Sequence, residues 1–217
     1  MTENILREVV EEIETGFMAY AEGEYQQHHQ SQIALVSSGC LICIIWKGTL
    51  YLANVGNSRA ILGSRKGFGP FKRWDVKQML RDHDCNNLEI RTELARLHPE
   101  EEQVCNEIGE RWYVKSLSET RRCIGYAYMK KMPFTQSESF RIPRWEEVTP
   151  PFTNSLLSSE PDVYSRVLKG TDRFIIFGSS GFWKLLTNKG AAKIVKTFPR
   201  DGIAKKTSDD CSREYSC

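Results

Sequence analysis

Apolar side chains recur three or four positions apart through the first twenty residues, with glutamates between them: Ile5, Leu6, Val9, Val10, Ile13, Phe17 and Tyr20. This spacing predicts an amphipathic helix, which Thr2 can cap and Gly16 weakens. The following stretch is rich in glutamine, contains His28 and His29, and predicts a loop. An adjacent histidine pair with no other ligands nearby is not expected to bind a metal.

Apolar runs and turn residues alternate in the next part of the chain. Residues 41–46 and 49–55 flank Lys47-Gly48, which predicts a hairpin because Gly supplies the positive φ of a two-residue turn. Residues 58–62 predict a further strand, and the Gly-rich residues 66–70 predict a loop. A second hairpin and two more strands are expected at residues 104–108, 111–116, 163–168 and 173–177.

Helical patterns lie between these strands. Residues 86–97 predict a helix that His98-Pro99 ends. Three leucines are expected on one side of it: Leu88, Leu94 and Leu97. Residues 132–159 are rich in Pro, Ser and Thr, and they predict a long surface excursion.

The C-terminal part of the chain predicts one more helix. A helical turn is expected over 184–187, and Asn188 is expected to cap a helix over 189–198 that Pro199 stops. Antiparallel hairpins with helices inserted among them favour an α+β fold with packed sheets over an alternating βαβ fold.

The composition excludes several classes of protein. With 217 residues and a net charge of +2, the chain is about one domain and gives no sign of a nucleic-acid partner. No apolar run approaches the ~20 residues of a bilayer helix. Residues 1–12 have neither a basic nor an apolar signal-peptide region. We therefore expect an intracellular protein, cytoplasmic or nuclear, without a membrane span.

The seven cysteines are an odd number, and without a signal peptide they are expected to be reduced thiols. Cys40 and Cys43 form a CxxC pair inside an apolar run. Residues three apart on a strand point to opposite faces, and no second CxxC is present. We therefore expect structural cysteines rather than a zinc or redox site.

The charge is unevenly spread along the chain. Residues 1–24 carry seven acids and one base, a net charge of −6, so the other 193 residues carry +8. We expect a solvated acidic helix face over a mildly basic body, and a dedicated acidic docking surface is the alternative.

Five ordered segments resemble the motifs of one family. Residues 48–60 read Gly-Thr-Leu-Tyr-Leu-Ala-Asn-Val-Gly-Asn-Ser-Arg-Ala and resemble GxLxxANxGDSRA. Asp82-His83 and residues 94–100 resemble a DH pair and an LxxxHP[ED] stretch. Residues 121–128 resemble SRSIGDAY, and residues 177–183 resemble FASDGLW. In this order and at this spacing, the chain resembles the metal-dependent protein serine/threonine phosphatases of the 2C type, in particular a plant subgroup.

The resemblance covers roughly residues 3–204 and implies a fold and a chemistry. The fold is a partial phosphatase domain over residues 1–204, with two packed antiparallel sheets flanked by helices, followed by a polar, disordered tail over 205–217. The family gathers two or three Mg²⁺ or Mn²⁺ ions with aspartates at one edge of the sandwich, and a metal-bridging water attacks the phosphorus. Such hard ions need oxygen ligands, usually ionised carboxylates.

The chain departs from the family at these positions. Asn57 stands where the family has the Asp of GDSRA, and Ser180 stands where it has the Asp of SDG; the resemblance assigns both aspartates to the metal site. Tyr126 replaces the Asp of the IGD motif, whose role is less direct. Lys184 stands where an acid is common. The DGHGG and terminal DN motifs are absent, and Asp209-Asp210 lacks the Asn that would follow.

These losses predict a catalytically inactive relative without a bound metal cofactor. Strands that precede the first helix in the family are also missing, so we expect unpaired sheet edges and exposed apolar faces. The predicted role is binding of phosphoproteins or phosphatase regulators without turnover. The alternatives are a weakly active Mn²⁺- or Mg²⁺-dependent phosphatase and a relic with no folded function. Oligomeric state is open.

Overall fold

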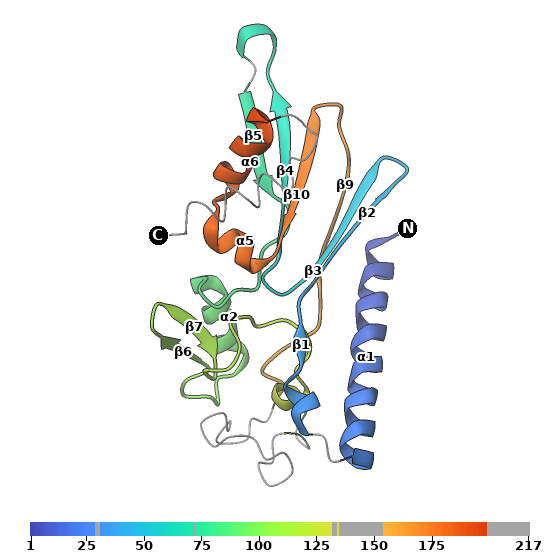
Figure 1. Ribbon diagram of the computed structural model, residues 1–217, viewed down its shortest axis with the longest axis vertical. Helices are drawn as coiled ribbons and strands as arrows, with labels where there is room; N and C mark the ends of the chain where they lie inside the picture. Colours follow the sequence, from blue (N-terminus) through green and yellow to red (C-terminus); the bar gives the residue numbers. More distant parts are fainter. Residues whose placement is uncertain (29–30, 72, 132–133, 135–153, 199–217) are drawn as a thin grey trace.

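The computed structural model describes residues 1–28, 31–71, 73–131, 134 and 154–198, and in these residues two three-stranded antiparallel sheets face each other (Figure 1). The first sheet has the order β2-β3-β9 and consists of Cys40–Trp46, Thr49–Val55 and Asp162–Val167. The second has the order β10-β4-β5 and consists of Asp172–Gly178, Arg59–Lys66 and Arg73–Gln78. The predicted α+β sandwich of antiparallel sheets is confirmed.

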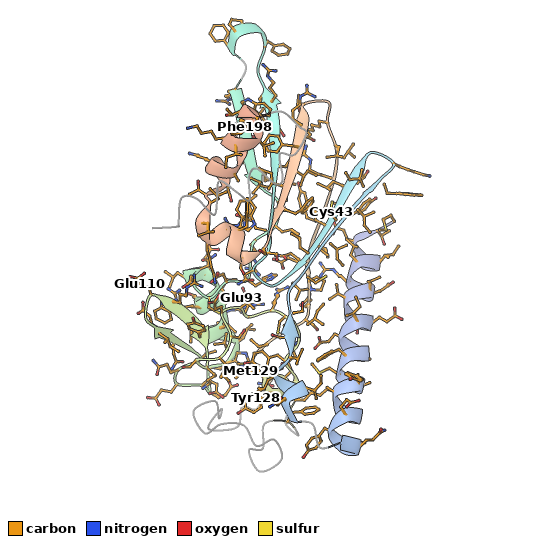
Figure 2. The ribbon with its side chains drawn as sticks, in the orientation of Figure 1. Cys43, Glu93, Glu110, Tyr128, Met129 and Phe198 are labelled. Atoms are coloured by element: carbon orange, nitrogen blue, oxygen red, sulfur yellow. The ribbon has the colours of Figure 1, made fainter. Side chains whose placement is uncertain are left out.

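The interior of the sandwich is built from alternate residues of the central strands. Alternate positions on a strand face the same side, so Leu50 and Leu52 of β3 and Ala60 and Leu62 of β4 are buried together between the sheets. Each fully buried leucine contributes about 2 kcal/mol of transfer free energy. Cys43 packs against this core from β2 (Figure 2), as expected for a structural cysteine.

The β2–β3 hairpin has the predicted two-residue turn. Lys47 and Gly48 have φ values of 48° and 74°, so both residues are left-handed, as in a type I′ turn. This turn matches the right-handed twist of the strands, and it fixes a continuous register from Cys40–Val55 to Trp46–Thr49.

Helix α1 (Glu3–His28) lies along the β2-β3-β9 sheet (Figure 1). Its inner face buries Leu6, Val10, Met18 and Ala21. The helix continues to His28, so the loop predicted for the glutamine-rich stretch is wrong for residues 26–28, and His29 lies outside the described residues. Glutamine has good helix propensity, and the second half of the helix is held by packing against the rest of the protein.

The acidic residues of α1 contact basic groups beneath the helix. Glu14 accepts hydrogen bonds from the Gly125 N–H at 2.8 Å and from Lys130 Nζ at 2.7 Å. Glu22 pairs with Lys131 at 2.6 Å. The helix therefore lies over basic groups as expected, but Glu14, whose side chain is 12% exposed, is not part of a solvated acidic face.

Helices α5 (Ser180–Leu185) and α6 (Asn188–Thr197) cover the outer face of the second sheet, where Ile61 of β4 packs with Ala191 and Ala192. The predicted cap at Asn188 is wrong. Thr187 is the N-cap, and its hydroxyl accepts a hydrogen bond from the Gly190 N–H at 3.0 Å. The predicted helical turn over 184–187 lies earlier, because the chain is extended at Leu186 and Thr187.

A smaller lobe lies below the sandwich and has its own apolar core. It contains η1 (Ser31–Leu35), α2 (Leu88–Leu97), the β6–β7 hairpin (Cys105–Ile108 and Arg111–Val114), η3 (Ala127–Met129), and the short strands β1 (Ser37–Ser38) and β8 (Ile124–Gly125). Tyr128 and Met129, labelled in Figure 2, are fully buried in this lobe. The antiparallel pairing of β6 and β7 confirms the second predicted hairpin.

Two predictions about this lobe are wrong. The buried face of α2 is Ile90 and Leu94, which are four positions apart, whereas Leu88 and Leu97 are exposed. The predicted surface excursion over 132–159 ends in the core, because Leu156 and Leu157 are buried there. Residues 132–133 and 135–153 of that segment lie outside the described residues, as do residues 205–217.

Strand β5 was not predicted from the sequence. It follows the Gly-rich segment that was predicted to be a loop. In that segment β4 continues to Lys66, and the short helix η2 (Gly69–Phe71) lies between β4 and β5. Its sequence, Arg-Trp-Asp-Val-Lys-Gln, is mostly polar because it lies at the edge of its sheet. In the described part of the chain, no helix is long and apolar enough to cross a membrane.

Candidate functional site

The register between β4 and β10 brings two of the predicted positions to the same sheet edge. Arg59 pairs with Gly178, so Asn57 and Ser180 each lie two residues beyond this pair at the same end of the strands. Asn57 is half-buried in the turn between β3 and β4, and Ser180 is half-buried at the start of α5. We call this end of the sandwich the rim.

Asp82-His83 is the third segment at the rim. The His83 N–H donates to Gly56 O at 3.0 Å, and the Gly56 N–H donates to His83 Nδ1 at 3.1 Å. Because Nδ1 accepts, a neutral His83 carries its proton on Nε2, which lies 3.3 Å from Asp162 Oδ2. Burial lowers the pKa of His83, and this outweighs the opposing effect of Asp162. His83 therefore holds the β3–β4 turn in its neutral form.

Asp162, the first residue of β9, is surrounded by cations. Arg81 Nε lies 2.9 Å from Asp162 Oδ2, and Arg122 Nη1 lies 3.1 Å from Oδ1. Burial alone would raise the pKa of the Asp162 carboxyl, but the contacts with His83, Arg122 and Arg81 hold it well below its usual value. Asp162 is thus a carboxylate whose oxygens are already occupied.

Three further carboxylates near the rim are paired in the same way. Asp82 contacts Arg59 Nη2 at 2.5 Å. Glu93 of α2, labelled in Figure 2, contacts Arg121 Nη1 at 2.6 Å and Arg81 Nη1 at 3.2 Å. Glu119 contacts Arg111 Nη1 at 2.8 Å and Lys184 Nζ at 2.9 Å. Six cationic side chains therefore engage four carboxylates, and we call this set the rim network.

The rim residues do not fit the Mg²⁺ or Mn²⁺ ions that the resemblance implies. Divalent ions of this kind bind through several carboxylate oxygens on one point. Among the described residues, no group of three or more His, Cys, Asp or Glu side chains could hold a metal ion. Asn57 offers one neutral carbonyl oxygen, Ser180 a hydroxyl, and Lys184 adds positive charge beside Glu119.

Tyr126 is not part of the rim. It is buried in the core of the smaller lobe, and its backbone N–H donates to Val36 O at 2.7 Å. Its φ of 59° is left-handed, a conformation that Asp adopts more readily than an aromatic residue. The structure therefore brings Asn57 and Ser180 together and separates Tyr126 from them.

Sequence reasoning missed most of the rim network. Arg81, Arg122, Glu93 and Asp162 come from four separate segments, and their pairing depends on how β9 meets the end of β3. For the arginines, the sequence offered one signal: Arg121-Arg122 stands where the family motif has a small residue and a single arginine. Asp162 carried no signal of this kind.

Comparison with known proteins agrees with this fold. The sequence model of the family described as "Protein phosphatase 2C" matches residues 4–217. The chain is 38% identical over 206 residues to "Probable protein phosphatase 2C 43" of Oryza sativa subsp. japonica, covering 95% of this chain and 51% of that protein. It is 42% identical over 176 residues to "Probable protein phosphatase 2C 68" of Arabidopsis thaliana, covering 80% and 44%. The chain thus spans about half the length of these relatives.

Solved structures show the same fold at low sequence identity. A serine-threonine phosphatase 2C from Toxoplasma gondii superposes with a TM-score of 0.60 at 14% identity, covering 93% of this chain and 60% of that chain. A C. elegans sex determining protein gives a TM-score of 0.67 at 15% identity, covering 100% and 44%. The family model that matches nearly the whole chain and the plant relatives lead to one conclusion: the chain belongs to the protein phosphatase 2C family.

Proposed function

We propose that this chain binds phosphoproteins or phosphatase regulators without hydrolysing phosphoesters. The observation that carries the proposal is the rim network, in which Asp82, Glu93, Glu119 and Asp162 are each engaged by arginine or lysine. A metal-dependent phosphatase needs free anionic oxygens at this edge to hold its ions. Here the same edge carries more positive than negative side chains.

Electrostatics makes metal binding at such an edge unfavourable. Two unit charges at about 4 Å interact by about 4 kcal/mol at an effective dielectric constant of 20, and a metal ion is divalent. A tenfold change in affinity corresponds to about 1.4 kcal/mol. Replacing even one carboxylate by Asn57 or Ser180 therefore costs orders of magnitude in affinity, and unbalanced arginines add repulsion.

The retained scaffold supports a binding role. The inter-sheet core between β3 and β4 is closely packed, and the β2–β3 hairpin keeps a continuous register. A folded phosphatase-like surface can recognise phosphoproteins or regulators by shape and charge even where no turnover occurs.

The proposal is tested with the purified 217-residue chain. We expect no hydrolysis of phosphoserine or phosphothreonine peptides above background with added Mn²⁺ or Mg²⁺, and no saturable Mn²⁺ binding by calorimetry. Cooperative urea unfolding of the same sample serves as the folding control. Mn²⁺-supported turnover that a chelator abolishes would contradict the proposed inactivity.

The proposed binding role is tested separately from the proposed inactivity, with a chelator present throughout. Fluorescence anisotropy should show tighter binding of phosphorylated peptides than of their unphosphorylated counterparts. Equal affinity for both forms would reject recognition of phosphoproteins and leave the proposed inactivity standing.

A further inference from the structure

A cavity of about 560 Å³ opens between α5 and α6, beside the first residue of β4. Its polar lining consists of Arg59, Lys184, Thr187, Asn188 and Lys189, and its apolar wall includes Trp183. The lining residues include three cations and no carboxylate. The cavity is therefore suited to a ligand that carries negative charge.

Arg59 is held in a fixed orientation at one side of the cavity. Its Nε and Nη2 bond to Asp82, and its Nη1 donates to Asn188 Oδ1 at 2.9 Å. Its guanidinium carbon lies 5.3 Å from the centre of the Trp183 ring, within cation–π range. A cation positioned in this way loses little conformational entropy when an anion binds.

The two lysines are on the two helices that line the cavity. Lys184 lies on α5 and is exposed, with its ammonium 2.9 Å from Glu119 Oε2. Lys189 lies in the first turn of α6, is exposed, and forms no ion pair among the described residues. Lys189 is thus a cation at the cavity that no described carboxylate neutralises.

The backbone of α6 adds to the positive potential. The first N–H groups of a helix have no intrahelical acceptor and carry the positive end of the helix dipole. Thr187 caps only the Gly190 N–H, and the first turn of α6 contains no acidic residue. The dipole and Lys189 therefore act on the cavity from the same side as Asn188.

We propose that this cavity binds a phosphoryl dianion, using Arg59, Lys184 and Lys189 as its cationic contacts. A phosphoryl group carries close to two negative charges and three acceptor oxygens, so it can use donors from several directions at once. The cavity has room for such a group together with the side chain that carries it. The inference deepens the proposed function and rests on it for the claim that the bound group is not hydrolysed.

The direct test is a titration of the full chain with inorganic phosphate, in the presence of a chelator, followed by ¹H–¹⁵N NMR. We expect saturable shifts of the amides of residues 187–190. Lys189→Gln should weaken binding about threefold to fivefold, as for loss of one exposed charge contact. The double variant Lys184→Gln/Lys189→Gln should weaken it more than tenfold.

Lys193→Gln is the matched control. Lys193 is an exposed lysine on the same helix, one turn further on and outside the cavity lining. It should leave the phosphate affinity unchanged, and all variants should keep the midpoint of urea unfolding within error. Equal weakening by Lys193→Gln and Lys189→Gln would overturn the site, because general surface charge would then explain the binding.

The ligand's own titration gives a second readout. The second pKa of a phosphoryl group is about 6, so binding should weaken as the pH falls from 8 to 5. Sulfate keeps its charge over this range and should bind with little pH dependence. A phosphate affinity that does not follow the pH would argue against recognition of the dianion.

Two comparisons identify the source of the phosphoryl group. A phosphoserine peptide that binds at least tenfold more tightly than phosphate, with its unphosphorylated twin not binding, assigns the cavity to a phosphorylated side chain. Equal affinity of peptide and phosphate assigns it to a free anion. Absence of saturable shifts with either ligand overturns the inference, whereas metal-dependent turnover with intact binding overturns only the proposed inactivity.

Discussion

Asp162 connects three parts of the rim that are far apart in the sequence. It starts β9, it faces the buried His83, and it contacts Arg81 and Arg122. Because its side chain is 25% exposed, the ion pairs are stronger than a typical surface pair but weaker than fully buried ones. Removing its charge would leave Arg122, which is nearly buried, without its carboxylate partner.

We therefore expect Asp162→Asn to lower the free energy of unfolding by about 1–3 kcal/mol at pH 7. The pKa of Asp162 is lowered in the folded state, so the unfolded chain binds its proton first. The stabilisation is complete above the unfolded value of about 3.9 and is lost as the pH falls below it. Urea unfolding at pH 7 and pH 3 should show the difference between wild type and variant shrinking at the lower pH.

Asp75→Asn provides a matched control for this prediction. Asp75 pairs with Lys66 on the edge of the second sheet, where both side chains are about half exposed. An exposed pair of this kind contributes less than about 1 kcal/mol. If Asp75→Asn and Asp162→Asn destabilise the protein equally, the rim network is no more than a set of surface ion pairs.

Gly125 illustrates how one backbone position constrains the smaller lobe. Its φ is +75°, and a Cβ at this position would lie 2.5 Å from Val36 O and 2.8 Å from the Phe17 ring. Gly125→Ala should therefore destabilise the protein by more than about 2 kcal/mol, combining backbone strain and overpacking. Gly16→Ala in α1 meets nothing within 4 Å and should stabilise it by about 0.5–1 kcal/mol. Thermal unfolding of both variants tests the contrast, and a stable Gly125→Ala would contradict the packing around Val36.

At the scale of elements, α1 has two apolar faces, of which one is buried and the other is exposed. Leu6 is 2% exposed and packs under the helix, whereas Val9 is 40% exposed on the outer side. The apolar stripe of Ile5, Val9 and Ile13 follows a spacing of four residues and faces outward. The helical periodicity alone could not separate the two faces, because both are apolar.

Substitutions on the two faces of α1 should differ in their effect. Leu6→Ala should lower the free energy of unfolding by about 2–4 kcal/mol through loss of buried contacts and a residual cavity. Val9→Ala should change it by less than about 0.5 kcal/mol, because Val9 is 40% exposed and Ala favours the helix. Chemical denaturation of the two variants measures this, and a large loss from Val9→Ala would show that the outer face is covered in solution.

The elements that the sequence predicted well are those with a local signal. The β2–β3 hairpin follows from its turn residues, and β9 and β10 follow from their apolar runs. Strand β5 escaped prediction because an edge strand with Arg73, Trp74 and Asp75 has no continuous apolar pattern. The N-cap moved from Asn188 to Thr187 because both residue types cap well and the choice depends on packing of α6.

Only part of the candidate site could be predicted from the sequence. Motif resemblance located Asn57 and Ser180, and the register of β4 and β10 brings them to one edge. The arginines that occupy the surrounding carboxylates could not be predicted, since their pairing arises from long-range contacts between β9, α2 and the Arg121-Arg122 segment. The local sequence does not indicate which residues from distant segments will lie close together in the fold.

At the scale of the whole molecule, apolar groups are exposed at sheet edges. Strand β2 is the edge of the first sheet, and its end exposes Ile45 (57%) and Trp46 (54%). Edge β5 of the second sheet exposes one large apolar side chain, Trp74 (39%), and also carries Lys77, a residue type that opposes strand pairing between molecules. The two edges therefore differ in their tendency to associate, in line with the expectation of unpaired edges and exposed apolar faces.

This difference predicts where the chain associates with itself as its concentration rises. The double variant Ile45→Lys/Trp46→Lys should reduce hydrophobic-dye binding and shift sedimentation profiles toward the monomer, because it places charges on the exposed end of β2. Its free energy of unfolding should stay within about 0.5 kcal/mol of wild type, since the replaced side chains are more than half exposed. Lys77→Thr should act in the opposite direction by removing a protective charge from β5. If the double variant sediments like wild type, the end of β2 is not the associating surface, and the outer stripe of α1 is the next to be tested with Val9→Lys.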